Sequence, residues 1–194
     1  LGSLTLALLE TGARVEAVEI DARLARRLPI TIKQFSPDAA DRLTVRCEDA
    51  VAMQPQAEVT AFVANLPYNT GVPILLNVLE RFASVTSGVV MVQAEVAQRL
   101  TAGPGSRQYG VPSVKTSWWA DATWAGKVGT EVFWPAPNVQ SGLVRFVRHE
   151  QPDAEQRAAT FAAVDAAFGH RRKMLRSALR EWAAPLPAVT ICEE

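Results

Sequence analysis

The sequence predicts an α/β fold with a parallel, doubly wound sheet, followed by a small helical region at the carboxyl end. Short apolar strands alternate with helical segments over the first 100 residues, a rhythm typical of a parallel sheet with helices on both faces. The strand predicted at residues 87–93, SGVVMVQ, is almost continuously apolar, as strands covered on both faces are. After His149 the sequence becomes Ala-rich, helical and increasingly basic, so we place a domain boundary near residue 150.

Each predicted element follows from the spacing of apolar residues and from the residues that interrupt them. Helices are expected at residues 4–10, 21–30, 73–81 and 94–100, the first closed by Gly12 and the second capped by Asp21. Strands are expected at residues 14–20, 42–50, 60–65 and 87–93, and a last alternating strand ends the proline-punctuated stretch 132–148. Residues 102–115, AGPGSRQYGVPSVK, predict a long loop with a functional or mobile role.

The composition is that of a folded globular protein. The chain has 194 residues, 48% hydrophobic and 21% charged, and its formal net charge of +0 indicates no polyanionic partner by itself. Cys47 and Cys192 form no metal or redox motif, and we expect one buried thiol and one near a chain end in a reducing compartment. No apolar run approaches the roughly 20 residues of a membrane span, and no signal peptide is recognisable. We expect a cytoplasmic protein with no membrane partner and no metal, acting as a monomer.

Polar residues follow three of the predicted strands: Glu19, Asp49 and Asn65. Ligands of open parallel sheets bind beyond the carboxyl ends of the strands. Glu19 is placed where an acid can accept both ribose hydroxyls of a nucleotide, and Asp49 where one can accept the exocyclic amine of an adenine. Gly2, before the first helix, resembles the tail of a glycine-rich loop whose amides meet a cofactor. The alternative, that Glu19 and Asp49 are solvated turn residues, is left open by each signal alone.

The stretch Asn65-Leu66-Pro67-Tyr68 ends a predicted strand with an amide, a proline and an aromatic, and it resembles the (D/N/S)-PP-(Y/F) motif of amino-methylating enzymes. An adenine N6 amine is a poor nucleophile because its lone pair is delocalised into the ring. The Asn65 side-chain oxygen and the Leu66 carbonyl can hold its hydrogens so that the lone pair points at an electrophilic methyl. Pro67 fixes the backbone, and Tyr68 offers a ring face on which an extracted base can stack. The alternative is a strand-end turn in which Tyr68 is a core aromatic.

The carboxyl-terminal region predicts an RNA-binding surface. Its basic residues are Arg171, Arg172, Lys173, Arg176 and Arg180. An apolar stripe at helical spacing accompanies them: Phe168, Leu175, Ala178, Leu179 and Trp182. Basic residues packed in this way suit contacts with phosphates, although an ordinary solvated helix face is the alternative.

The order of these segments resembles the 16S rRNA adenine dimethyltransferase family. The segments that carry the resemblance, from residue 1 to about residue 182, are LGSLT, VEID, CEDA, NLPYNTGVPIL, MVQAEVAQRL, VFWPAPNVQSGLVR and FGHRRKMLRSAL. The resemblance implies a Rossmann-like, class I S-adenosylmethionine-dependent methyltransferase domain at residues 1–150 and a basic, helical RNA-binding domain at residues 151–194. It also implies S-adenosylmethionine as the cofactor and two adjacent adenines near the 3′ end of 16S rRNA, in the small ribosomal subunit, as the sites of N6 dimethylation during ribosome biogenesis.

Roles carry over by position onto the matching residues. The cofactor-binding residues implied are Gly2, Glu19, Asp49 and Asn65, the last lying between cofactor and target base. Phe133 resembles the family aromatic that packs against the target base opposite Tyr68, although a plain core Phe is the alternative. The first sheet strand and most of the glycine-rich loop of the family have no counterpart here, and the region after Trp182 is shorter than the family's helical tail. We therefore expect further residues in the full-length protein.

Two other functions remain open. One is a 23S rRNA adenine N6-methyltransferase of the macrolide-resistance type, in which Ile more often stands where this chain has Leu66. The other is a non-catalytic RNA-binding or ribosome-assembly factor that keeps the fold without the chemistry. The intact set of Glu19, Asp49 and Asn65 favours the enzyme over this second alternative.

Overall fold

The structure is a computed structural model that describes residues 1–150, 154–169, 174–180 and 182–183. The chain divides into two compact units, Leu1–Ala57 and Glu58–Glu194, and each is described by itself.

The first unit is a two-stranded parallel sheet with helices packed on one face. Its elements are α1 (Ser3–Glu10), β1 (Val15–Val18), α2 (Ala22–Phe35), the 3-10 helix η1 (Pro37–Arg42) and β2 (Leu43–Arg46). Strands β1 and β2 pair in register from Val15↔Leu43 to Val18↔Arg46. Alternate residues of both strands pack against a small core whose buried members are Leu9, Leu28, Ile32 and Ala39.

Local sequence signals set the helix ends of this unit as expected. Asp21 caps α2, because its Oδ1 accepts a hydrogen bond of 2.8 Å from the Arg23 amide. Gly12 follows α1 with φ +87 and donates its amide to the Leu9 carbonyl at 3.0 Å, which ends the helix with a left-handed residue.

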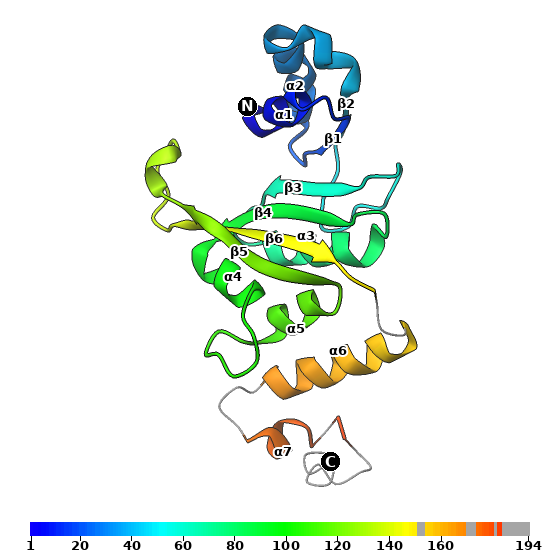
Figure 1. Cartoon of the computed structure of the whole chain (residues 1–194), viewed down its shortest axis with the longest axis vertical. Coiled ribbons are helices and arrows are strands. Elements are labelled where there is room, and N and C mark those ends of the chain that lie inside the picture. Colours follow the sequence, from blue (N-terminus) through cyan, green and yellow to red (C-terminus); the bar gives the residue numbers. More distant parts are fainter. Residues whose placement is uncertain (151–153, 170–173, 181, 184–194) are drawn as a thin grey trace. The chain divides into compact units, whose positions relative to one another are not determined.

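The second unit is built on a four-stranded mixed sheet in the order β3-β4-β6-β5 (Figure 1). Its strands are β3 (Ala61–Asn65), β4 (Ser87–Gln93), β5 (Ala120–Val128) and β6 (Ser141–Arg148). β3 and β4 are parallel, whereas β6 runs antiparallel to both β4 and β5. The helical elements are α3 (Gly71–Arg81), α4 (Ala94–Leu100), α5 (Val111–Ser117) and the 3-10 helix η2 (Thr130–Val132).

The strands of this sheet approach one another closely at Gly88 of β4. A Cβ at this position would lie 2.2 Å from the Phe62 carbonyl oxygen and 2.5 Å from the Phe146 ring. Phe146 itself is fully buried. Only glycine therefore fits here, and the contact fixes β4 between its neighbours.

Helix α6 (Ala154–Gly169) packs against α5 within the second unit. Trp118 meets Phe161 edge to face with ring centroids 5.7 Å apart, and the Lys115 ammonium lies 2.8 Å from an Asp165 carboxylate oxygen. The short helix α7 (Leu175–Ala178) follows. The domain boundary expected near residue 150 remains a prediction.

Arg148, the last residue of β6, closes the end of α3. Its guanidinium donates to the Val85, Leu79 and Phe82 carbonyls at 2.7, 2.8 and 3.1 Å. Burial lowers the pKa of Arg148. The side chain satisfies the Leu79 carbonyl in the last turn of α3 and also binds the Phe82 and Val85 carbonyls of the segment that follows.

The α/β fold is confirmed, but the sheet differs from the expected all-parallel one. Strand β6 returns antiparallel, because a connection of twelve residues, 129–140, joins it to β5 without a crossover helix. Strand β5 was not predicted as a separate strand. The sequence context of Trp118, Trp119 and Trp124 predicts core positions. Trp119 is buried, but Trp124 on β5 is 41% exposed, so for Trp124 that prediction is wrong.

Two smaller expectations also fail. The loop predicted at residues 102–115 ends at Gly110, because the Ser113 hydroxyl accepts the Gly110 amide at 3.0 Å and starts α5 at Val111. Cys47 is exposed instead of buried.

Candidate functional site

The residues expected to hold the target adenine lie at one edge of the four-stranded sheet. The register pairs Asn65 with Met91 near the end of β4, and Gln93 with Ser141 at the start of β6. Ser141 in turn pairs with Val128, the last residue of β5. The carboxyl ends of β3, β4 and β5 therefore share an edge with the amino end of β6, and both the 65–68 stretch and the 129–140 connection leave from it.

The 65–68 stretch is held by its second residue. Leu66 is 5% exposed and its amide donates to the Met91 carbonyl at 2.9 Å, so the strand pairing extends one residue beyond Asn65. A Cβ on Gly71 would lie 3.2 Å from Leu66 Cβ, which shows how closely the start of α3 packs on this side chain. Asn65 and Pro67 are exposed on either side. The buried leucine thus presents the amide of Asn65 at the surface.

Tyr68 is 43% exposed, so the expectation of an accessible ring is met and the core alternative does not hold. Its hydroxyl lies 3.5 Å from the Ser141 Oγ, and Ser141 is itself buried. This contact ties the tyrosine to the amino end of β6. The ring keeps a solvent-facing surface on which a base can stack.

Phe133 lies in the connection between β5 and β6, directly after η2. It is half-buried, and its amide donates to the Thr130 carbonyl at 3.3 Å. The following residue, Trp134, is 98% exposed and is joined to Pro135 by a cis peptide bond. The connection therefore presents aromatic surface at the edge that carries Asn65.

The two acids of the first unit lie at the carboxyl edge of its own sheet. Glu19 follows β1, and its amide donates to the Arg46 carbonyl at 3.0 Å, which extends the pairing of β1 with β2. Its Oε1 accepts the Asp21 amide at 2.9 Å. Asp49 follows β2 and is exposed, and its Oδ1 accepts the Val51 amide at 2.9 Å. Each carboxylate therefore orders its own turn with one oxygen, and a carboxylate has further acceptor sites for a ligand.

Gly2 has a structural reason to be glycine. It precedes α1 with φ +83, and its carbonyl accepts the Leu6 amide at 2.8 Å. A Cβ at Gly2 would lie 2.7 Å from Leu28 Cδ1. The residue lets α1 begin close against α2, and its role in cofactor binding remains a prediction.

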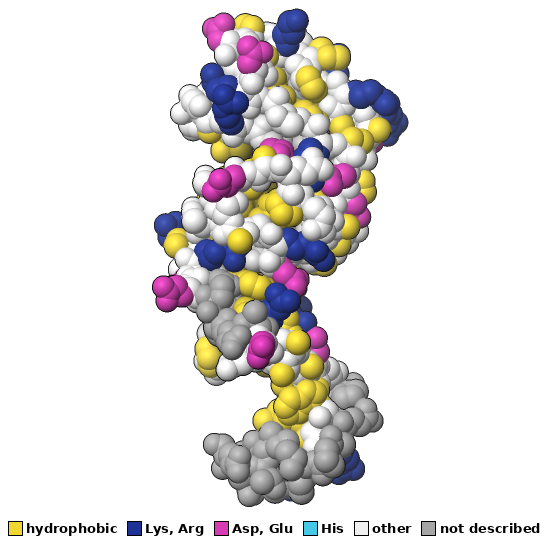
Figure 2. All heavy atoms as spheres, turned by 90° about the vertical axis from the view of Figure 1, so that its right-hand side faces the viewer, with side chains coloured by type: hydrophobic (Ala, Val, Ile, Leu, Met, Phe, Trp, Pro, Cys, Tyr) yellow, Lys and Arg dark blue, Asp and Glu magenta, His cyan; other side chains and the backbone are white. Residues whose placement is uncertain are grey.

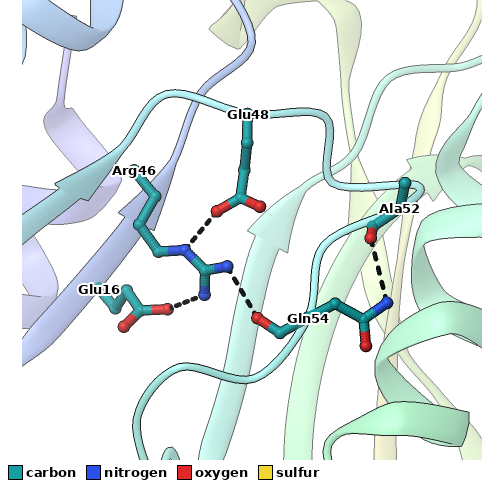
Figure 3. Close-up of polar contacts among 5 residues, drawn as sticks. All are labelled: Glu16, Arg46, Glu48, Ala52 and Gln54. Atoms are coloured by element: carbon teal, nitrogen blue, oxygen red, sulfur yellow. Dashed lines mark hydrogen bonds and ion pairs between the residues drawn. The ribbon is translucent and has the colours of Figure 1, made fainter.

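A buried ion cluster beside the Asp49 turn was not predicted from the sequence. The side chain of Arg46 lies between those of Glu16 and Glu48 and also reaches the Gln54 backbone (Figure 3). Its guanidinium donates to Glu16 Oε1 at 2.7 Å, to Glu48 Oε1, and to the Gln54 carbonyl at 2.7 Å. We call these four residues the Arg46 cluster. Charges of opposite sign in two adjacent strands, VEAV and LTVR, are the signal that could have indicated it.

Only part of the expected RNA-binding region can be placed. Arg171, Arg172 and Lys173 lie outside the described residues, whereas Arg176 on α7 and Arg180 after it are exposed. Met174 is extended, with φ −62 and ψ 145, so the apolar stripe does not continue along one helix from Phe168 to Trp182 as expected. On the face shown in Figure 2, Lys and Arg side chains are interspersed with Asp and Glu.

Within the residues that the structure describes, no three His, Cys, Asp or Glu side chains are grouped to hold a metal ion. None of the described helices has the length and hydropathy required to span a bilayer.

Comparison with curated proteins finds close relatives that share one name. The chain is 60% identical over 182 residues to the Ribosomal RNA small subunit methyltransferase A of Leifsonia xyli, covering 92% of this chain and 65% of the relative. It is 56% identical over 192 residues to the protein of that name from Streptomyces griseus, covering 97% of this chain and 66% of the relative. The chain thus spans just under two thirds of the length of these relatives.

Solved structures share the fold at lower identity. A dimethyladenosine transferase from Plasmodium falciparum superposes with a TM-score of 0.75 at 22% identity, covering 92% of this chain and 64% of that one. The 23S rRNA methyltransferase ErmE superposes with a TM-score of 0.72 at 24% identity, covering 94% of this chain and 72% of that one. These likenesses confirm the methyltransferase-type α/β fold.

The sequence profile of one family matches residues 1–185, nearly the whole chain. The motifs that this match spans include the 65–68 stretch and the acids at the ends of β1 and β2. The chain belongs to the Ribosomal RNA adenine dimethylase family.

Proposed function

We propose that the protein transfers methyl groups from S-adenosylmethionine to N6 of two adjacent adenines near the 3′ end of 16S rRNA, in the small ribosomal subunit, during ribosome biogenesis. The observation that carries the proposal is the 65–68 stretch, in which a buried Leu66 presents Asn65 and Tyr68 at the carboxyl edge of the sheet. The name shared by relatives at 60% and 56% identity supports the choice of the small subunit.

The target adenine would be held by acceptors and by aromatic surface. The Asn65 side-chain oxygen and the Leu66 carbonyl accept the two N6 hydrogens, which aims the nitrogen lone pair away from the ring plane. Tyr68 stacks on one face of the flipped base, and Phe133 contacts it from the opposite side. Pro67 adds no competing donor at this position. Positioning is the main contribution of these residues to the rate.

The residues of the first unit fit S-adenosylmethionine by the chemistry of their acceptors. Glu19 would accept the ribose hydroxyls and Asp49 the adenine amine, each through carboxylate capacity beyond the one backbone amide that it already binds. Gly2 and Asn65 complete the proposed set. When bound, the cofactor would supply an electrophilic methyl on its sulfonium sulfur: a neutral thioether leaves as the N6–C bond forms, and the proton released from the amine passes to solvent, so the protein needs neither a metal nor a strong base.

RNA contacts beyond the target base are assigned to the basic carboxyl-terminal region. Residues 1–150 form the catalytic domain in this proposal and residues 151–194 the RNA-binding domain, with Arg171, Arg172, Lys173, Arg176 and Arg180 contacting phosphates. Exposure of Arg176 and Arg180 supports this assignment. The protein acts as a cytoplasmic monomer on the small ribosomal subunit.

The test is methyl transfer by the full-length protein. Labelled S-adenosylmethionine is incubated with unmethylated small subunits and, separately, with 23S rRNA, and the modified bases are mapped. Label on two adjacent adenines of the small subunit is the expected result. Label confined to 23S rRNA would replace the proposal with the macrolide-resistance type of activity, and RNA binding without transfer would replace it with an assembly factor.

Asn65→Ala tests the proposed chemistry at one residue. Transfer should fall by a factor of at least about 100, because the amine loses a positioning acceptor, while rRNA affinity stays within about twofold. The matched control is Asn69→Ala, which removes an exposed amide from the turn before α3 and should leave transfer intact. Equal losses of transfer and of rRNA binding in Asn65→Ala would assign Asn65 a structural role.

A further inference from the structure

Arg46 is a buried charge in the smaller unit of the protein. Its side chain is 6% exposed, and the guanidinium bonds to two carboxylates, on Glu16 and Glu48, and to one backbone carbonyl, on Gln54. Burial is the strongest single influence and opposes the charge, but the hydrogen bonds and the charge attraction to Glu16 and Glu48 together raise the pKa of Arg46. The side chain is therefore a permanent cation with bonds in three directions, a geometry that suits the planar fork of arginine.

Two of these bonds lie on either side of Asp49. Glu48 directly precedes Asp49, and Gln54 follows it by five residues. Between them, Asp49 orders the turn itself, because its Oδ1 accepts the Val51 amide at 2.9 Å and its carbonyl accepts the Ala52 amide at 3.1 Å. The guanidinium thus ties together the two ends of the loop at residues 48–54 (Figure 3).

The third side-chain bond joins the Arg46 guanidinium to the neighbouring strand. Glu16 lies in the middle of β1, the strand that leads to Glu19, and its Oε1 accepts from Arg46 at 2.7 Å. The backbone of Arg46 adds a second link, since its carbonyl accepts the Glu19 amide at 3.0 Å. One residue is therefore bonded to the turns of both candidate cofactor acids.

We propose that Arg46 is a positioning residue that holds the 48–54 loop in the conformation that binds S-adenosylmethionine. This inference rests on the proposed function, because it assigns a purpose to the geometry of Asp49. Arg46 does not touch the cofactor in this scheme and acts only through the loop. In a loosened loop, Asp49 would occupy its binding conformation for only part of the time. The apparent affinity for the cofactor would fall by that fraction, whereas the transfer step would not change.

Two carboxylates on the same guanidinium provide a matched pair of variants. Glu48→Ala removes the guanidinium's bond at one end of the loop and leaves only the bond to the Gln54 carbonyl, whereas Glu16→Ala removes the bond to β1 and leaves both bonds to the loop. In Glu48→Ala we expect the Kd for S-adenosylmethionine, measured by calorimetry on the full-length protein without RNA, to rise about tenfold, which corresponds to about 1.4 kcal/mol. The value of kcat at saturating cofactor and the KM for rRNA should stay within about twofold of the unaltered protein. Glu16→Ala should lower the melting temperature while the Kd stays within about twofold.

Hydrogen exchange tests the loop without cofactor or RNA. The Val51 and Ala52 amides, which donate to Asp49, should exchange faster in Glu48→Ala than in the unaltered protein, and at unchanged rates in Glu16→Ala. Unchanged exchange in Glu48→Ala, or an equal rise in Kd for both variants, would overturn the inference. Methyl transfer by the unaltered protein is measured first, because its absence rejects the proposed function, whereas the inference is rejected by the behaviour of the variants alone.

Discussion

The two units of the protein hold their candidate residues by different means. In the first unit, the turns of Glu19 and Asp49 are tied by the Arg46 cluster, a set of charged and polar groups beside a sheet of only two strands. In the second unit, Asn65 and Tyr68 stand on either side of a buried leucine within a four-stranded sheet. Removing one partner of a buried ion pair destabilises the protein, because the other charge is left buried and unpaired. Shortening a buried apolar side chain destabilises the protein, because it leaves a cavity.

This difference matches what each pair of residues is proposed to bind. Glu19 and Asp49 would bind a polar nucleoside through carboxylates, so their turns need a fixed arrangement of charge. Asn65 and Tyr68 would bind a base that leaves the RNA stack, so they need a rigid support that does not compete for hydrogen bonds. Variants that remove one kind of support at a time test this difference between the two units.

The largest expected effect comes from the apolar anchor. Leu66→Ala should lower the free energy of unfolding by about 2–5 kcal/mol, because the deletion leaves a cavity beside Gly71 and Val92. It should also lower kcat strongly, because Asn65 and Tyr68 lose their common support. Leu75→Ala is the control, since Leu75 is fully buried on α3 and should cost similar stability with a smaller loss of kcat. Denaturant unfolding and methyl transfer measure the two effects, and equal kcat in both variants would show that Leu66 stabilises the unit without positioning the stretch.

A smaller effect is expected at Arg148, a partly buried arginine of the second unit. Arg148→Met removes donors from the Leu79, Phe82 and Val85 carbonyls and should cost about 1–3 kcal/mol of unfolding free energy. The KM for S-adenosylmethionine should not change, because Arg148 closes a helix and supports no candidate residue. A rise in this KM as large as the roughly tenfold rise in Kd expected for Glu48→Ala would remove the distinction between Arg46 and Arg148. Thermal unfolding and initial rates are the measurements.

The smallest effect is a pH dependence at the surface of the first unit. The hydrogen bond from the Arg23 side chain, followed by that from the Arg23 amide, lowers the pKa of Asp21 below its usual range. A lowered pKa means that the stabilising contribution is present above the unfolded pKa and is lost as the pH falls through the folded pKa. Asp21→Asn keeps an acceptor for the cap but does not titrate.

The unaltered protein should therefore be slightly more stable than Asp21→Asn at about pH 6, and the difference should shrink as the pH falls to about 3. Urea unfolding across this range is the measurement. A difference that is constant with pH would show that the ion pair contributes nothing beyond the neutral cap.

Features set by residues that lie close together in the sequence could be predicted. The bounds of β4 and α4 match the expected ones, because a continuous apolar run ends where helical spacing begins. The cap at Asp21 was predicted for the same reason, since the acceptor and the amide that it binds lie two residues apart. The 65–68 stretch was identified from its chemistry, and its exposure agrees with that reading.

Features that depend on the partner strand were not predictable. Strand β5 was missed because its sequence, ADATWAGKV, alternates small and polar residues around an exposed Trp124, and its pairing with β6 shifts register before Gly126. The Arg46 cluster was missed because Glu16 and Arg46 lie 30 residues apart in the chain, and only the pairing of β1 with β2 brings their side chains within 2.7 Å of each other. The burial of Ser141 beside Tyr68 likewise requires the sheet order.

The sheet order also has a consequence for the synthesis of the protein on the ribosome. Strand β6 occupies the place between β4 and β5, although it is translated after both. Until residues 141–148 have left the exit tunnel, β4 keeps one open edge and β5 has no partner in its final sheet. Open edges pair readily with other chains. The nascent chain is thus most exposed to aggregation just before β6 emerges, and a premature stop before residue 141 would release it in that state.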